Sequence, residues 1–134
     1  MDDGLRELYQ EVILDHSRHP RHFGVLEAPT HTGEGYNPLC GDRVKLFLVV
    51  DGDGRITDVK FDGKGCAISQ ASASMLTEEI KGMKLEDVAR LSKDIVLENV
   101  GIGISPTRMK CAMLGLRVLK SAAIGEIAGW PDED

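Results

Sequence analysis

Residues 42–61 read DRVKLFLVVDGDGRITDVKF, and this stretch decides the fold class. Apolar residues alternate along both of its halves, which is the period of a strand that buries one face. Between the halves, the run DGDG at residues 51–54 is a strong hairpin turn. The sequence therefore predicts an antiparallel pair, with strands over residues 42–50 and 55–61. The alternating apolar positions are Val44, Leu46, Leu48 and Val50 on the first strand, and Ile56, Val59 and Phe61 on the second.

Helical periodicity lies on both sides of this hairpin. Residues 4–15 form an amphipathic helix that we expect to end between His16 and Pro20. Residues 20–39 are rich in proline and glycine and predict a loop, with room for a short extended segment before Asn37. We expect residues 62–65, DGKG, to break the second strand.

The second half of the chain is predicted to be helical. One helix follows Cys66 and ends at Gly82, and one or two short helices occupy residues 84–100. Residues 101–104 are expected to be flexible, and Ser105 and Pro106 to start a last helix over residues 107–128. Residues 129–134 are expected to fray. The predicted fold is α+β, with a small antiparallel sheet of about three strands and helices on one face.

Composition limits the class of protein. The 134 residues fit a single domain, which we place at residues 1–134. The formal net charge of −6 argues against a general nucleic-acid binder. No stretch approaches the roughly 18 apolar residues of a membrane span, and the acidic start MDDGLRELYQ does not resemble a secretory signal. We therefore expect a cytoplasmic protein without nucleic-acid or membrane partners.

Two metal-like patterns have simpler interpretations. His16, His19 and His22 have the spacing H-x2-H-x2-H, but arginines interleave them, so we interpret this region as a solvated helix end and loop. The run DGDG also resembles the start of a calcium loop. The rest of that twelve-residue pattern, including its closing glutamate, is missing, so we reject calcium.

The three cysteines fall at the ends of predicted elements. Cys40 lies in the turn before the first strand, Cys66 in the strand-to-helix turn, and Cys111 in the first two turns of the last helix. In a reducing compartment three cysteines are not a disulfide framework. Each of them taken alone is most simply a small buried apolar residue. Loops and element ends, however, are where functional residues concentrate.

The residues around these cysteines suit anionic sulfur. A helix N-terminus favours thiolate at Cys66, and Gly63 and Gly65 allow close backbone approach. Arg108 and Lys110 place positive charge near Cys111. The carboxylate of Asp42, two residues after Cys40, adds an oxygen ligand. Three thiolates and one carboxylate would suit tetrahedral zinc or the iron of a sulfide-bridged cluster. On chemistry alone, a shared site and separate buried cysteines remain equally open.

Four motifs match a known family in order. They are LYQEVILDHSRHPRHFG at residues 8–24, NPLCGD at 37–42, FDGKGCAISQASAS at 61–74 and RMKCAML at 108–114. With these motifs the chain resembles the IscU/SufU iron–sulfur scaffold family, which also forms the N-terminal part of NifU. The resemblance covers nearly the whole chain, and it implies an α+β fold with a metal site at one end.

The resemblance also implies a function. Family members accept sulfur from a cysteine desulfurase, usually as a persulfide on the third cysteine, here Cys111. Scaffold members build a 2Fe–2S cluster and pass it to acceptor or carrier proteins, so they are carriers and not enzymes. The implied ligands of the cluster, or of zinc at the same site, are Cys40, Asp42, Cys66 and Cys111. In the family this aspartate favours release of the cluster.

Three features divide the chain between two branches of the family. Lys110 stands where the IscU branch has histidine, as in the SufU branch, and we interpret it as a charged neighbour rather than a ligand. The stretch before Cys111 lacks the insertion of SufU proteins. The segment ISPTR at residues 104–108 replaces the Leu-Pro-Pro-x-Lys motif read by a chaperone, so chaperone recognition is doubtful. A zinc-bound sulfur acceptor therefore stays open beside the scaffold, as does, more remotely, structural zinc in an interaction module.

Overall fold

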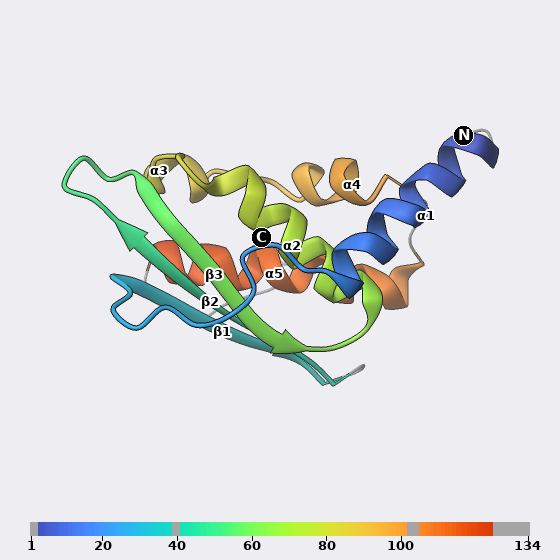
Figure 1. Ribbon diagram of the computed structural model, residues 1–134, viewed down its shortest axis with the longest axis horizontal. Coiled ribbons are helices and arrows are strands. Elements are labelled where there is room, and N and C mark those ends of the chain that lie inside the picture. The colour runs from blue at the N-terminus through green and yellow to red at the C-terminus, as the bar shows by residue number, and fades with distance from the viewer. Residues whose placement is uncertain (1–2, 39–40, 102–104, 125–134) are drawn as a thin grey trace.

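The computed structural model describes residues 3–38, 41–101 and 105–124 and has an α+β fold (Figure 1). A three-stranded antiparallel sheet forms one layer, and helices cover one of its faces, as the sequence predicts. Within the described residues, no helix has the length and apolar character needed to cross a membrane. The elements in chain order are α1 (Asp3–Arg18), β1 (His31–Asn37), β2 (Asp42–Val50), β3 (Ile56–Lys64), α2 (Ala67–Ile80), α3 (Leu85–Val88), α4 (Asp94–Val100) and α5 (Pro106–Ile124).

The predicted hairpin is confirmed as β2 and β3, which pair antiparallel with Leu46 opposite Phe61. The predicted strand break at residues 62–65 is wrong, because β3 continues to Lys64. Gly63 lies opposite Val44, and a Cβ atom there would collide with the carbonyl oxygen of Arg43. The glycine thus allows the strand to continue where the sequence pattern indicated a break.

Strand β1 (His31–Asn37) lies where the sequence allows a short extended segment before Asn37, and it is the third strand of the predicted sheet. It pairs with β2 along its whole length and completes the sheet in the order β1-β2-β3. Two of its inward positions, Gly33 and Gly35, are glycines, so β1 lacks the alternation of apolar side chains that is typical of a strand. A Cβ on Gly33 would lie 2.6 Å from the carbonyl oxygen of Val118, and one on Gly35 would lie 2.5 Å from Cγ2 of the same residue. The glycines therefore let α5 pack directly on the strand backbone.

Helices α2 and α5 pack on the sheet and on each other, and α1 packs against α2. Together they enclose one apolar core. The low aromatic content agrees with this core, which is built mainly from aliphatic side chains. Its largest fully buried side chains are Phe61, Leu46, Leu48, Ile56, Leu76, Ile80, Leu114, Leu116 and Leu119.

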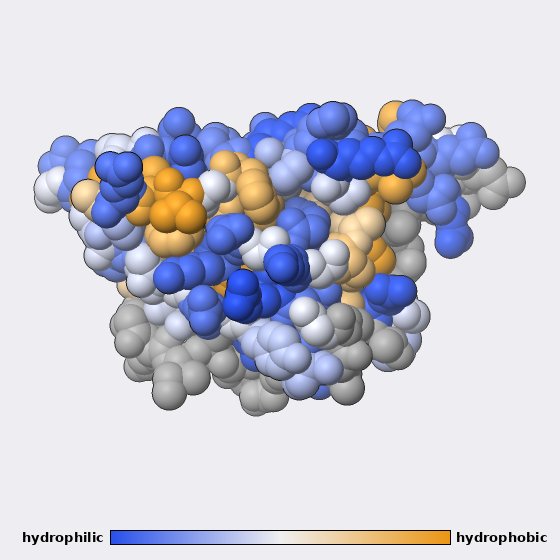
Figure 2. Space-filling model, turned by 60° about the horizontal axis from the view of Figure 1, so that its bottom comes forward, coloured by the Kyte–Doolittle hydropathy of each residue, from blue (hydrophilic) through white to orange (hydrophobic). Residues whose placement is uncertain are grey.

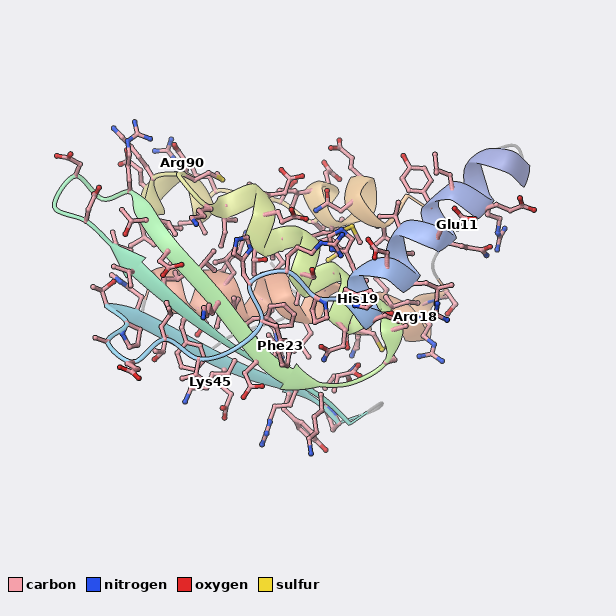
Figure 3. All side chains as sticks on the ribbon, viewed as in Figure 1. Glu11, Arg18, His19, Phe23, Lys45 and Arg90 are labelled. Atoms are coloured by element: carbon pink, nitrogen blue, oxygen red, sulfur yellow. The ribbon has the colours of Figure 1, made fainter. Side chains whose placement is uncertain are left out.

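The segment between α1 and β1 crosses the sheet on the side away from the helices (Figure 1). Phe23 forms a parallel bridge with Phe61, and their rings meet edge to face at 5.2 Å. On the outward face of β2, Nζ of Lys45 lies 5.3 Å from the ring centre of Phe47. Figure 3 shows Lys45 projecting away from the helices.

The hydrophobic residues visible in Figure 2 lie in separate areas among hydrophilic ones.

Several predicted helix ends are confirmed. Gly82 has a φ of +92° just beyond Lys81, the cap of α2. The side chain of Ser105 accepts a 3.3 Å hydrogen bond from the backbone N–H of Arg108, so it caps α5. The short helices α3 and α4 occupy the stretch where one or two were predicted. The predictions for residues 102–104 and 125–134 fall outside the described residues.

The histidine region differs from the prediction of a solvated helix end. His16 is buried, and its Nδ1 lies 2.7 Å from Oγ of Ser74 on α2. Nδ1 of His22 lies 3.1 Å from Oγ1 of Thr77, one turn further along α2. Helix α1 brings His16 against α2 because α1 packs there, which periodicity alone could not show. His16 therefore attaches the end of α1 to α2, and His22 attaches the segment that follows α1 to the same helix.

Candidate metal centre

Three predicted ligands meet at one end of the sheet. Asp42 is the first residue of β2, Cys66 is the N-cap of α2, and Cys111 lies in the second turn of α5. One ligand atom from each lies within 4.8 Å of the other two. Within the described ranges this is the only group of three or more histidine, cysteine or acidic residues with such geometry. The starts of α2 and α5 and the end of β3 lie at the same end of the molecule (Figure 1).

The carboxylate of Asp42 is fully buried and oriented by hydrogen bonds to both of its oxygens. The backbone N–H of Cys66 donates to Oδ1 at 2.9 Å, and Nδ2 of Asn37 lies 3.4 Å from Oδ2. Buried carboxylates need such partners, because burial without them is strongly unfavourable. The carboxylate is therefore set in place by the fold.

Gly65 makes this arrangement possible. A Cβ atom on Gly65 would overlap Oδ1 of Asp42 and lie 2.5 Å from Oγ of Ser69. The sequence predicted close backbone approach at this glycine, and the structure confirms it, with the Asp42 carboxylate as the approaching group. Ser69 in turn donates a 3.1 Å hydrogen bond to the carbonyl oxygen of Cys66. The first turn of α2 is thereby held against the carboxylate.

Cys111 is fully buried, as a structural cysteine would be, yet it borders the two other ligands. Its sulfur lies 3.6 Å from Nδ2 of Asn37. The next residue, Ala112, accepts a 2.7 Å hydrogen bond at its carbonyl oxygen from the buried hydroxyl of Ser72 on α2. This bond fixes α5 against α2 next to the cysteine. Cys66 is half-buried and is the more accessible of the two sulfurs.

Arg108 adds positive charge at the two sulfurs. Its pKa is raised above the usual range, first by the negative charge of Cys66 and a hydrogen bond to that sulfur, and then by the same effects of Cys111. The guanidinium is exposed, so solvent screens this interaction. Arg108 thus interacts with both sulfurs, and its predicted role in stabilising anionic sulfur stays a prediction.

The remaining predicted site residues are Cys40 and Lys110. Cys40 falls outside the described residues, so its role as a ligand stays a prediction. Lys110 is half-buried beside Cys111, and its influence on the site also stays a prediction.

The donor set of Asp42, Cys66 and Cys111 combines two sulfurs with one oxygen. Zinc takes thiolate and carboxylate ligands in tetrahedral sites, and the predicted fourth ligand, Cys40, would complete such a set. Thiolates also hold the iron of iron–sulfur clusters. The residues present therefore fit both groups, and their chemistry alone favours neither.

Asn37 is a site residue that the sequence interpretation missed. It belongs to the motif NPLCGD, which by itself assigns no role to the asparagine. Its side chain lies on the inward face of β1, because inward positions alternate along the strand from Gly33 through Gly35 to Asn37. A polar residue on an inward position next to a cysteine motif would have been the sequence feature that pointed to it.

Comparison with known proteins identifies the family of this chain. The family model described as the NifU-like N terminal domain matches residues 8–127. The chain belongs to this family. The family match includes all the residues of the candidate centre, from Asn37 to Cys111.

Individual members of the NifU-like family carry two kinds of name. The chain is 38% identical to the zinc-dependent sulfurtransferase SufU of Bacillus subtilis, over 93% of this chain and 95% of that protein. It is 37% identical to the iron–sulfur cluster assembly scaffold protein IscU of Thermotoga maritima, over 86% and 92%. A crystal structure from Fervidobacterium islandicum, described as a candidate scaffold for the SUF system, aligns with a TM-score of 0.76 and 30% identity, covering 88% of this chain and 98% of that one.

Proposed function

We propose that this protein is a scaffold on which an iron–sulfur cluster is assembled and from which it is passed on. One observation carries the proposal: ligand atoms of Asp42, Cys66 and Cys111 converge within 4.8 Å in a member of the NifU-like family. In this proposal the cluster is cargo, held by these three residues and Cys40. The protein is then a carrier rather than an enzyme.

Sulfur would arrive on Cys111 as a persulfide donated by a cysteine desulfurase. Cys111 lies next to Asp42 and Cys66, so sulfur delivered there would already be beside the other ligands. Arg108 places positive charge beside both sulfurs and would stabilise the anionic sulfur species. The partners in this proposal are the desulfurase and proteins that accept the cluster, and the compartment is the cytoplasm.

Mixed oxygen and sulfur ligation suits a cluster that must be released. The carboxylate of Asp42 accepts hydrogen bonds from the backbone of Cys66 and the side chain of Asn37. A carboxylate has about four lone-pair sites, so these two donors leave room for a metal ion on the same oxygens. Four thiolates would hold a cluster more tightly, so the aspartate favours transfer over storage.

Anaerobic reconstitution tests the scaffold. The protein would be mixed with ferrous iron, cysteine, a cysteine desulfurase and a thiol reductant that reduces the persulfide sulfur to sulfide, and the visible spectrum would be recorded. We expect a 2Fe–2S spectrum that is lost when Cys40, Cys66 or Cys111 is changed to alanine. Arg90→Ala, which changes a residue at the opposite end of the molecule (Figure 3), should leave the spectrum unchanged. An identical spectrum in all three cysteine variants would overturn the proposal.

A second function, a zinc-bound sulfur acceptor, is favoured by one specific observation. Lys110 stands before Cys111, as in the SufU branch, and a relative with 38% identity is named a zinc-dependent sulfurtransferase. Against it, the stretch of this chain before Cys111 lacks the insertion of SufU proteins.

Mass spectrometry separates the two functions. After incubation with a desulfurase and cysteine, a persulfide adds about 32 Da to the chain, the mass of one sulfur atom. A zinc-bound acceptor would gain this mass with zinc retained and would form no cluster when iron is added. A scaffold would exchange its metal and develop the cluster spectrum. Absence of the added mass would rule out the acceptor.

A further inference from the structure

Asn37 joins two of the candidate ligands through one amide group. Its Nδ2 lies 3.4 Å from Oδ2 of Asp42 and 3.6 Å from Sγ of Cys111. Asp42 is five residues away along the chain and Cys111 is 74. An amide nitrogen carries two hydrogens, so one group can serve both acceptors. The side chain thus connects the start of β2 to the second turn of α5.

The backbone on both sides of this amide is held in place. Asn37 pairs with Asp42 in the sheet, and its carbonyl oxygen accepts a 2.8 Å hydrogen bond from the N–H of Gly41. The carbonyl oxygen of the preceding Tyr36 accepts a 3.0 Å hydrogen bond from the buried guanidinium of Arg117 on α5. Asn37 itself is fully buried. An amide anchored in this way is a rigid donor.

We propose that Asn37 is a positioning residue that sets the affinity of the centre for its metal. Two anionic groups repel each other when no ion lies between them, and a shared N–H donor offsets that repulsion. With the amide present, the carboxylate and the sulfur stay at a separation that one ion can span. The inference rests on the proposed function, because it needs Asp42 and Cys111 to be ligands.

The expected size of the effect follows from other metal sites. Removing a group that hydrogen-bonds a metal ligand typically lowers metal affinity by about 10- to 100-fold. Hydrogen bonds to sulfur also withdraw electron density from it, which changes the electronic properties of the centre. The amide should therefore affect both the affinity and the spectrum of a bound metal.

Two variants separate the donor from the volume it fills. Asn37→Ala removes the amide and leaves space, whereas Asn37→Leu keeps the branched shape but has no N–H. The matched control is Thr77→Val, which keeps the branched shape and loses a buried 2.7 Å hydrogen bond to the carbonyl oxygen of Ser74, away from the ligand atoms. Zinc affinity would be measured by competition with a chromophoric chelator, and the spectrum with cobalt(II). Thermal unfolding of the metal-free proteins would set a temperature at which each is folded.

We expect both Asn37 variants to bind zinc about 10- to 100-fold more weakly than the wild type. Their sulfur-to-cobalt(II) charge-transfer band should move to longer wavelength. The sulfur of Cys111 no longer accepts a hydrogen bond in these variants, so its electrons lie at higher energy. Thr77→Val should lower the unfolding temperature while zinc affinity and the cobalt band stay unchanged. If the Asn37 side chain only fills space, Asn37→Leu should instead bind zinc as tightly as the wild type does.

The same experiment distinguishes this inference from the proposed function. If the wild-type protein binds neither zinc nor cobalt(II), the metal centre itself is wrong. If the wild type binds both and the two Asn37 variants match its affinity and spectrum, only the role of Asn37 is wrong.

Discussion

The backbone N–H of Cys66 donates a 2.9 Å hydrogen bond to Oδ1 of Asp42, which lies 24 residues earlier in the chain. This bond ties the start of α2 to the start of β2. It does so with protein atoms alone, so the carboxylate is oriented before any metal arrives. The contact depends on Gly65, whose backbone leaves no space for a side chain beside the carboxylate.

Gly65→Ala should therefore damage the centre directly. The added methyl group would overlap Oδ1 of Asp42 and crowd Oγ of Ser69, so the carboxylate must move. We expect the free energy of unfolding to fall by about 1–3 kcal/mol, as in other overpacked sites, and zinc affinity to fall with it. Gly52→Ala is the control, because a Cβ there meets nothing within 4 Å. Equal zinc affinity in Gly65→Ala and the wild type would contradict this account.

Arg108→Ala should change how the sulfurs react with charged reagents. The exposed guanidinium interacts with Cys66 and Cys111 and attracts anions to them. We expect a negatively charged aromatic disulfide to react about threefold more slowly with the variant, and a neutral disulfide to change less. High salt should remove the difference, because salt screens exposed charges.

Arg90→Ala is the matched control for this charge, since it also removes one arginine but lies by α3, at the other end of the molecule (Figure 3). It should leave both reaction rates unchanged. The interpretation fails if the two arginine variants slow the charged reagent to the same extent.

His16 should make the stability of the protein depend on pH. Burial lowers the pKa of its ring below the usual 6.5, and the charge of Arg21 lowers it further, while Glu78 and Asp15 act in the opposite direction. The unfolded chain then binds a proton at a higher pH than the folded protein does. Between the lowered pKa and 6.5, protonation favours unfolding, so stability should fall as the pH falls through this window.

Urea unfolding at pH 7.5 and 5.5 measures this effect. His16→Gln removes the titrating ring, so its loss of stability between the two pH values should be smaller than in the wild type. His19→Gln, a change at an exposed histidine in the same region, should keep the wild-type dependence. An unaltered pH dependence in His16→Gln would show that other groups are responsible.

Gly101→Ala should destabilise the contact between α1 and α4. Gly101 caps α4 with a φ of +68°, and a Cβ there would fall on the ring of Tyr9. The left-handed backbone alone costs about 1–2 kcal/mol for a residue with a Cβ, and displacing the ring adds to this. Gly82→Ala is the matched control, because its φ is +92° but its Cβ would meet nothing within 4 Å. Urea unfolding should show the larger loss in Gly101→Ala, and equal losses would exclude the ring contact.

Much of the fold could be predicted because the signals are local. The alternation of Val44, Leu46 and Leu48 and the turn that follows specify the hairpin within twenty residues. The cap at Ser105 is equally local, since its partner is the N–H of Arg108, three residues further on. Periodicity and capping depend on neighbours in the chain, so they can be read without a tertiary structure.

The length and pairing of strand β1 and the burial of His16 could not be predicted in this way. The inward positions of β1 require glycine because Val118, more than eighty residues away, packs on the strand backbone. His16 is buried because α1 lies on α2, where Ser74 meets its ring. Both features depend on contacts between distant segments. Local composition indicated only a short extended segment before Asn37, and it indicated a solvated helix end at His16.

For the centre itself, the sequence determined which residues are chemically able to form it. Asp42, Cys66 and Cys111 were candidate ligands from the sequence alone, because they lie at the ends of predicted elements and within family motifs. Only the tertiary structure decided that these three meet within 4.8 Å, and that Asn37 lies between two of them. The reason is that a ligand set is defined by distance in space. The packing of β2, α2 and α5 sets those distances, and no spacing along the chain contains them.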